Sequence, residues 1–138
     1  MVHALTEAHR VLKPNGILID LRPAHQHRRA GLGEGKDWES VGSMRENFDD
    51  DIAADRAVKQ VIRGRLFRQE EILEFDLDRV MDTLEDFRTW LDEFPDDKTP
   101  SHDWLYEKVK RALVKKPAGT KIAMRGPLRL AVMRKSTK

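Results

Sequence analysis

Four polar side chains that could contact a substrate lie near the end of a short apolar run and just beyond it. They are Asp20, Arg22, His25 and His27, in the segment IDLRPAHQH. Ligands of open α/β sheets bind beyond the carboxyl ends of the strands, and an imidazole there can remove a proton from a hydroxyl or an amine near neutral pH. We take these four residues as candidate substrate contacts and assign no catalytic residue. A solvated basic loop is the alternative interpretation.

The same segment gives a poor metal site. His25 and His27 lie two residues apart, but no third ligand follows at a suitable spacing, and catalytic zinc normally takes three protein ligands. The chain contains no cysteine, which excludes disulfides, thiolate catalysis and cysteine-ligated metal centres. We therefore predict no metal site.

A glycine-rich segment, GLGEGK at residues 31–36, has spacing close to that of a cofactor or phosphate loop. A working loop of this kind follows a hydrophobic strand and opens a helix, so that its amide groups point at the ligand. The preceding residues, HQHRRA, are not typical of a buried strand. The segment is interpreted as a flexible surface loop, and no cofactor-binding residue is assigned.

The amino-acid composition limits the classes of protein to which the chain can belong. The 138 residues suit one domain, 1–138, and 36% of them are charged although the formal net charge is only +2. This balance describes a mixed, solvated surface, so nucleic acid is not the expected partner. No apolar run approaches the roughly 20 residues of a membrane span, and no secretory pattern follows Met1. We expect a cytoplasmic protein without membrane contact.

The first elements lead directly to the candidate residues. Apolar positions at helical spacing over residues 2–13 predict a helix, which Pro14 must end, and Asn15-Gly16 supplies a turn. The nearly unbroken apolar run at residues 16–21 then predicts a strand covered on both faces, of the kind found in parallel sheets. A long polar loop is expected over residues 23–48.

The rest of the chain predicts further helices and strands, with no internal repeat. Three aspartates favour a helix start at residue 49, and Asp82 or Thr83 can cap another helix. The segment FRQEEILEFDLDRVM is ambiguous between helix and strand, and the alternation at residues 75–79 favours an extended segment. The C-terminal alternation on either side of Gly126-Pro127 predicts a hairpin or a bent antiparallel pair. The expected positions are a helix from 49 to about 64, a strand within 67–81, a helix over 84–94, a linker FPDDKTP, a helix after Ser101, and strands at 121–125 and 128–135.

The opening helix and turn carry a family resemblance. Glu7, the run Arg10 to Pro14 and Gly16 resemble the segment L-x-E-x-x-R-V-L-K-P-G-G of class I S-adenosylmethionine-dependent methyltransferases of the type 11 kind. In that family the segment leads into the fifth strand of a seven-stranded sheet. Asn15 replaces the usual glycine, and asparagine tolerates the same left-handed backbone.

The resemblance implies the second half of that fold and no more. It implies a partial Rossmann-like α/β sheet, with one parallel-type strand and a C-terminal antiparallel pair flanked by helices. The cofactor S-adenosylmethionine is implied by the family alone, and the cofactor-binding first half has no counterpart here. We therefore do not expect this chain to bind the cofactor or transfer a methyl group by itself.

Three functions remain open from the sequence. The first is a methyltransferase-like protein or fragment. The second is a non-catalytic oligomerisation or interaction module, and the third is a basic nucleic-acid-binding fragment. Because the family's fourth strand is missing, the fifth would expose a hydrophobic edge. We expect a homo-oligomer, or a chain that completes the sheet, unless residues 67–79 fold back over that edge.

Overall fold

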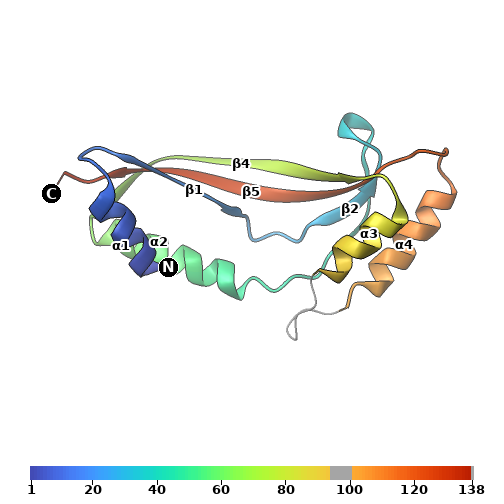
Figure 1. Cartoon of the computed structure of the whole chain (residues 1–138), viewed down its shortest axis with the longest axis horizontal. Coiled ribbons are helices and arrows are strands. Elements are labelled where there is room, and N and C mark those ends of the chain that lie inside the picture. Colours follow the sequence, from blue (N-terminus) through green and yellow to red (C-terminus); the bar gives the residue numbers. More distant parts are fainter. Residues whose placement is uncertain (94–100, 138) are drawn as a thin grey trace. The chain divides into compact units, whose positions relative to one another are not determined.

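The computed structural model describes residues 1–93 and 101–137. Over these residues the chain is an α/β structure with four α-helices and an open antiparallel sheet of five strands (Figure 1). The element bounds are α1 Val2–Val11, β1 Ile17–Pro23, β2 Arg29–Leu32, the short 3-10 helix η1 Gly35–Asp37, β3 Glu39–Ser43, α2 Asp49–Arg63, β4 Phe67–Met81, α3 Leu84–Asp92, α4 Asp103–Val114 and β5 Ile122–Lys135.

The chain divides into two compact units, where its length suggested one domain. The first unit uses three separate segments and the second uses two, and both include part of the long strands β4 and β5. The first comprises Met1–His25, Phe48–Phe75 and Pro127–Lys138, and the second comprises Gln26–Asn47 and Asp76–Gly126. Each unit has a hydrophobic cluster of its own.

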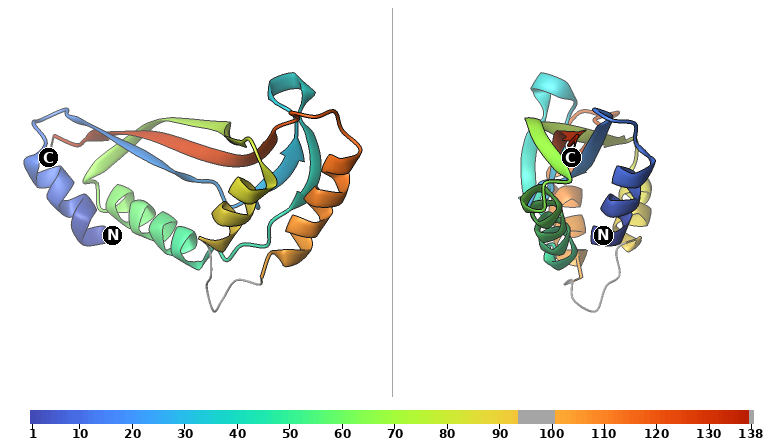
Figure 2. Two further views of the ribbon diagram at one scale, coloured as in Figure 1. Left: turned by 45° about the vertical axis from the view of Figure 1, so that its right-hand side comes forward. Right: turned by 90° about the vertical axis from the view of Figure 1, so that its left-hand side faces the viewer.

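In the first unit, α1 and α2 cover one face of β1 and the adjoining part of β5 (Figure 2). Met133 of β5 is buried there among Leu5 of α1 and Val58 and Val61 of α2. Asn15 adopts a φ of 63°, which allows the tight turn between α1 and β1. The expected helix, stop and strand at the start of the chain are therefore confirmed.

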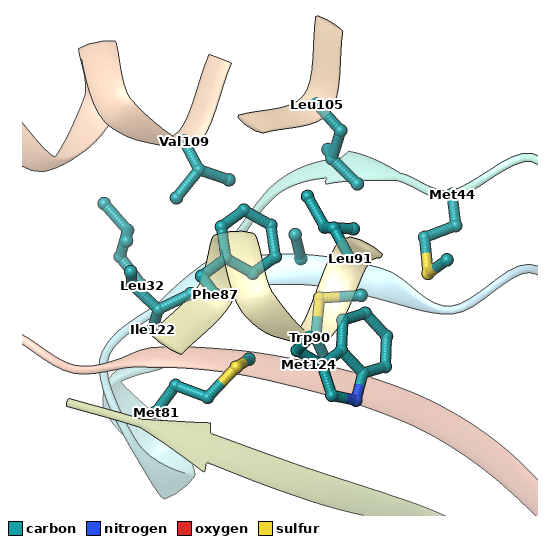
Figure 3. Close-up of a cluster of buried hydrophobic side chains, with 11 residues drawn as sticks. Leu32, Met44, Met81, Phe87, Trp90, Leu91, Leu105, Val109, Ile122 and Met124 are labelled. Atoms are coloured by element: carbon teal, nitrogen blue, oxygen red, sulfur yellow. The ribbon is translucent and has the colours of Figure 1, made fainter. Parts of the chain in front are cut away.

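In the second unit, α3 and α4 pack over the β2–β3 hairpin and the first residues of β5 (Figure 3). Phe87 and Trp90 project from α3, and Leu105 and Val109 from α4. They meet Ile122 of β5 and other apolar side chains in one buried cluster. The Thr83 side chain caps α3 by accepting a hydrogen bond from the N–H of Asp86 at 3.1 Å, so of the two predicted cap candidates, Asp82 and Thr83, the second is the cap.

Residues 23–48 are not the long polar loop that the composition suggested. They contain the antiparallel strands β2 and β3, with a bulge between Ala30 and Gly31. Ala30 and Leu32 are buried and supply the short apolar alternation of an inward-facing strand. The flanking arginines and glycines concealed this alternation because they are residues typical of loops.

The C-terminal residues form one continuous strand, so the predicted hairpin or bent antiparallel pair around Gly126-Pro127 is wrong. In the second unit β5 pairs with β2 through residues 122–125, and in the first it pairs with β1 through residues 128–134. Gly126 and Pro127 lie between these two registers, where a turn is not required. Strand β4 also pairs with β5, which confirms the extended interpretation of residues 67–81. It therefore does not fold over the free edge of β1.

The helices expected after residues 49, 83 and 101 are confirmed as α2, α3 and α4. The expected linker at residues 94–100 lies outside the described residues. None of the helices that the structure describes is long and apolar enough to cross a membrane.

The second unit's cluster should control the stability of that unit. Phe87→Ala removes a ring that is fully buried, so we expect the free energy of unfolding to fall by about 3–5 kcal/mol. Urea unfolding followed by circular dichroism measures this change. Val114→Ala, at a side chain 82% exposed near the end of α4, is the control, and we expect a change within about 0.5 kcal/mol. Equal effects of the two substitutions would contradict the assigned core.

Candidate functional site

Three of the four predicted substrate residues meet in the first unit. Arg22 is the centre of the group: its Nε lies 2.9 Å from both carboxylate oxygens of Asp20, and its Nη1 lies 2.8 Å from Oδ1 of Asp55. His25 places Nε2 at 3.2 Å from the other oxygen of Asp55. The His25 ring also stacks on Phe48, with 6.1 Å between ring centroids.

Asp55 is the member of this group that the sequence analysis missed. It lies on α2, 33 residues beyond Arg22, and no local spacing connects the two. Burial lowers the pKa of Arg22, but hydrogen bonds to Asp20 and Asp55 outweigh it, so this pKa lies above its ordinary value. Arg22 therefore stays charged, binds Asp20 of its own strand, and joins β1 to α2 through the carboxylate of Asp55.

His27 belongs to the second unit and makes a hydrogen bond within it. Its Nδ1 accepts a hydrogen bond of 2.9 Å from the backbone N–H of Glu46. In the same unit Glu46 binds Arg28 through its carboxylate. Among the described residues no group of three or more His, Asp and Glu side chains could hold a metal ion. The observed partners of the four residues fix local structure, and none of these contacts requires a substrate.

The glycine-rich segment does not fit a loop that holds S-adenosylmethionine. Residues 31–36 belong to the β2–β3 hairpin and the short η1, so no α-helix begins there. A Cβ on Gly31 would lie 2.3 Å from the indole of Trp38. That indole donates a hydrogen bond of 3.0 Å to the carbonyl oxygen of Ala123 and faces the Arg125 guanidinium. The glycine serves the packing of Trp38, and we derive no chemistry through a cofactor.

The outer edge of β1 is the more informative surface of the first unit. Strand β1 stands at the end of the strand order, and its only partner among the described strands is β5. The N–H of Lys135 donates to the carbonyl of Gly16, and that of Ala24 to the carbonyl of Pro127. In an antiparallel ladder, the even-numbered residues of β1 therefore bond to β5, whereas the odd-numbered residues direct N–H and C=O outward.

The outward-directed residues are also apolar. Ile17, Ile19 and Leu21 are 47%, 60% and 53% exposed. They lie on the face opposite α1 and α2, together with Val132 and Leu130 of β5. The predicted strand covered on both faces is therefore wrong: side-chain exposure alternates along β1, and its observed partner is antiparallel. The apolar run reflects one buried face and one uncovered apolar face.

Pro23 ends this edge. It occupies an odd-numbered position of β1, so its missing N–H is on the outward side and removes no hydrogen bond to β5. The free edge thus consists of Ile17, Ile19 and Leu21, with Pro23 at one limit.

Comparison of the chain with protein-family models, curated proteins and solved structures finds no match. The function is therefore argued from the described residues, of which the Arg22 group and the β1 edge are the two most definite features.

The Arg22 group should stabilise the first unit. Asp55→Asn removes a charge from a part-buried pair, and we expect it to lower the free energy of unfolding by about 1–3 kcal/mol. Chemical denaturation measures the change. Asp50→Asn, an exposed position of the same helix and of the same charge, is the control, and we expect about 0.5 kcal/mol from the helix dipole. If Asp55→Asn cost no more than the control, the group would have no structural role.

Proposed function

We propose that this chain is a non-catalytic assembly module that pairs with a second copy of itself along the free edge of β1. The observation that carries the proposal is the set of outward N–H and C=O groups of Ile17, Ile19 and Leu21, for which the described residues offer no partner. An unpaired strand edge is a template for another strand.

The edge is complementary to itself. When two copies of β1 run antiparallel with a twofold axis at Ile19, the two Ile19 residues exchange both backbone hydrogen bonds. Ile17 of each copy then exchanges hydrogen bonds with Leu21 of the other. Every outward group of these three residues gains a partner, because all of them have the same parity along the strand. In a register shifted by one residue, each outward-directed residue would face a residue of the other copy whose backbone groups already bond to β5.

The side chains agree with this register. On the uncovered face, Ile19 lies opposite Ile19, and Ile17 opposite Leu21, which are favourable apolar cross-strand pairs. On the other face, Asp20 lies opposite Leu18, so two like charges do not face each other. Arg22 already binds Asp20, which reduces the cost of placing that carboxylate next to an apolar neighbour. These features support a second copy as the occupant of the edge.

A charge at the centre of the edge should prevent association. Because Ile19→Lys places two ammonium groups opposite each other at the twofold axis, we expect the dimer dissociation constant to rise at least about tenfold. Sedimentation equilibrium over a concentration series measures this constant. Val11→Lys introduces the same charge at an exposed position of α1 and should leave the constant unchanged.

Ile19→Pro provides an independent test of the backbone contribution. It removes an outward N–H without removing a hydrogen bond to β5, so circular dichroism should be unchanged while the dimer weakens. A wild-type chain that remains monomeric at about 100 μM would contradict the proposal. Its association free energy would then be weaker than about 5–6 kcal/mol.

A methyltransferase-like role is the second candidate, and the opening of the chain favours it. Helix α1, the Asn15 turn and β1 follow the order that the family resemblance implies, and the antiparallel strands β4 and β5 supply a late pair of strands. The family's fourth strand would lie beside the edge of β1 that is free here. On this proposal, another polypeptide supplies that strand and the residues that hold S-adenosylmethionine.

Binding of the product S-adenosylhomocysteine tests this second candidate. Because the glycine-rich segment packs on Trp38, we expect isothermal calorimetry of the chain alone to show no saturable heat up to about 1 mM ligand, which corresponds to about 4 kcal/mol. Saturable micromolar binding would show instead that the chain holds a cofactor site of its own. Ile19→Lys in the same titration would then show whether that site needs the dimer.

A further inference from the structure

The first unit contains a cavity of about 600 Å³ at the end of α2, the start of β4 and the end of β5. Its size lies within the usual range of small-molecule sites. Positively charged and hydroxyl side chains dominate its polar lining: Arg65, Arg68, Arg134, Lys135, Ser136 and Thr137.

Two of the cations are held in place by backbone carbonyl groups. Arg134 donates a hydrogen bond of 2.8 Å to the carbonyl of Asn15, and Lys135 donates one of 2.7 Å to the carbonyl of Leu12. A carbonyl fixes the position of a cation but does not cancel its charge. These contacts therefore hold both side chains at the cavity without adding negative charge, and Arg134 also binds the carboxylate of Glu70.

One carboxylate faces this group of cations. Glu70 binds both Arg134 and Arg68, and hydrogen bonds from these two arginines lower its pKa to about 2. Glu70 is thus ionised at neutral pH and balances one of the four lining cations. Arg65 follows the end of α2 with a φ of 61°, and its guanidinium has no partner among the described residues. The cavity carries an excess of positive charge.

We propose that this cavity binds the phosphate group of a small soluble phosphate compound. Arg65 and Arg68 would supply charge-assisted hydrogen bonds, the Ser136 and Thr137 hydroxyls would donate further ones, and Arg134 and Lys135 would add positive charge. This proposal depends neither on the β1 edge nor on a cofactor, so its test is independent of the test of the assembly function.

A nucleic-acid surface would place its cations differently. The exposed face of α2 carries Arg56, Lys59 and Arg63, none of which lines this cavity. A polyanion bound along α2 would depend on those residues as much as on Arg65. The concave shape and the hydroxyl groups favour a compact phosphate instead.

Pyrophosphate is the probe for the test, titrated into the full chain by isothermal calorimetry. We expect saturable binding that Arg65→Gln weakens at least about tenfold, because it removes a charged donor from the cavity. Lys59→Gln makes the same change of charge on α2 outside the cavity and should alter the dissociation constant less than about twofold. Ile19→Lys should bind pyrophosphate like the wild type.

Two results would overturn the proposal. One is the absence of saturable binding up to millimolar pyrophosphate. The other is an equal loss of affinity in Arg65→Gln and Lys59→Gln, which would indicate a diffuse electrostatic effect. A single-stranded oligonucleotide forms the second arm: if it binds more tightly than pyrophosphate and both substitutions weaken it equally, the surface recognises nucleic acid rather than a compact phosphate.

Discussion

The hydrogen-bond ladder of β5 is the constraint on which the rest of the structure depends. Strands β1, β2 and β4 all pair with it, and it contributes buried side chains to the cluster of each unit. Its register with β1 sets which backbone groups of β1 are used internally and which point outward. The backbone groups that the edge offers to another strand are therefore determined by the pairing of β1 with β5 on its other side. This follows because alternate residues of a strand direct their N–H and C=O groups to opposite sides.

The helices of the first unit cover only one face of its strands, which explains why this unit combines a buried core with an exposed apolar face. Leu18 and Met133 are covered by α1 and α2, whereas Ile19 and its β5 neighbour Val132 lie on the other face. A sheet with one apolar face uncovered remains attached to its core while keeping apolar area available for association. The cationic cavity lies in the same unit, so this unit holds both features from which we argue function.

The sequence predicts elements well where one periodicity dominates, as in α2. Residues 67–81 fit either a helix or a strand in the sequence, and the preference for an extended segment is confirmed as β4. The sequence is less informative where contacts distant in the chain decide the structure. It fails where a local signal opposes a tertiary contact. Gly126-Pro127 signals a turn, but each side of it pairs with a different strand, and β5 continues through. The arginines near Ala30 conceal a buried strand. Asp20, Arg22 and His25, predicted as substrate contacts, instead bind one another or Asp55. Asp55 joins them only through the packing of α2 on β1, which local spacing cannot reveal.

Pro23 makes the two ends of the free edge unequal as places where a second strand can pair. With no outward N–H at that position, an incoming strand loses a hydrogen bond if it slides toward the C-terminal end of β1. In the proposed dimer, pairing centred on Ile19 avoids this loss, so Pro23 favours that register over one displaced toward the C-terminal end of β1. A single proline thus selects among registers of strand pairing at the free edge without removing a hydrogen bond to β5.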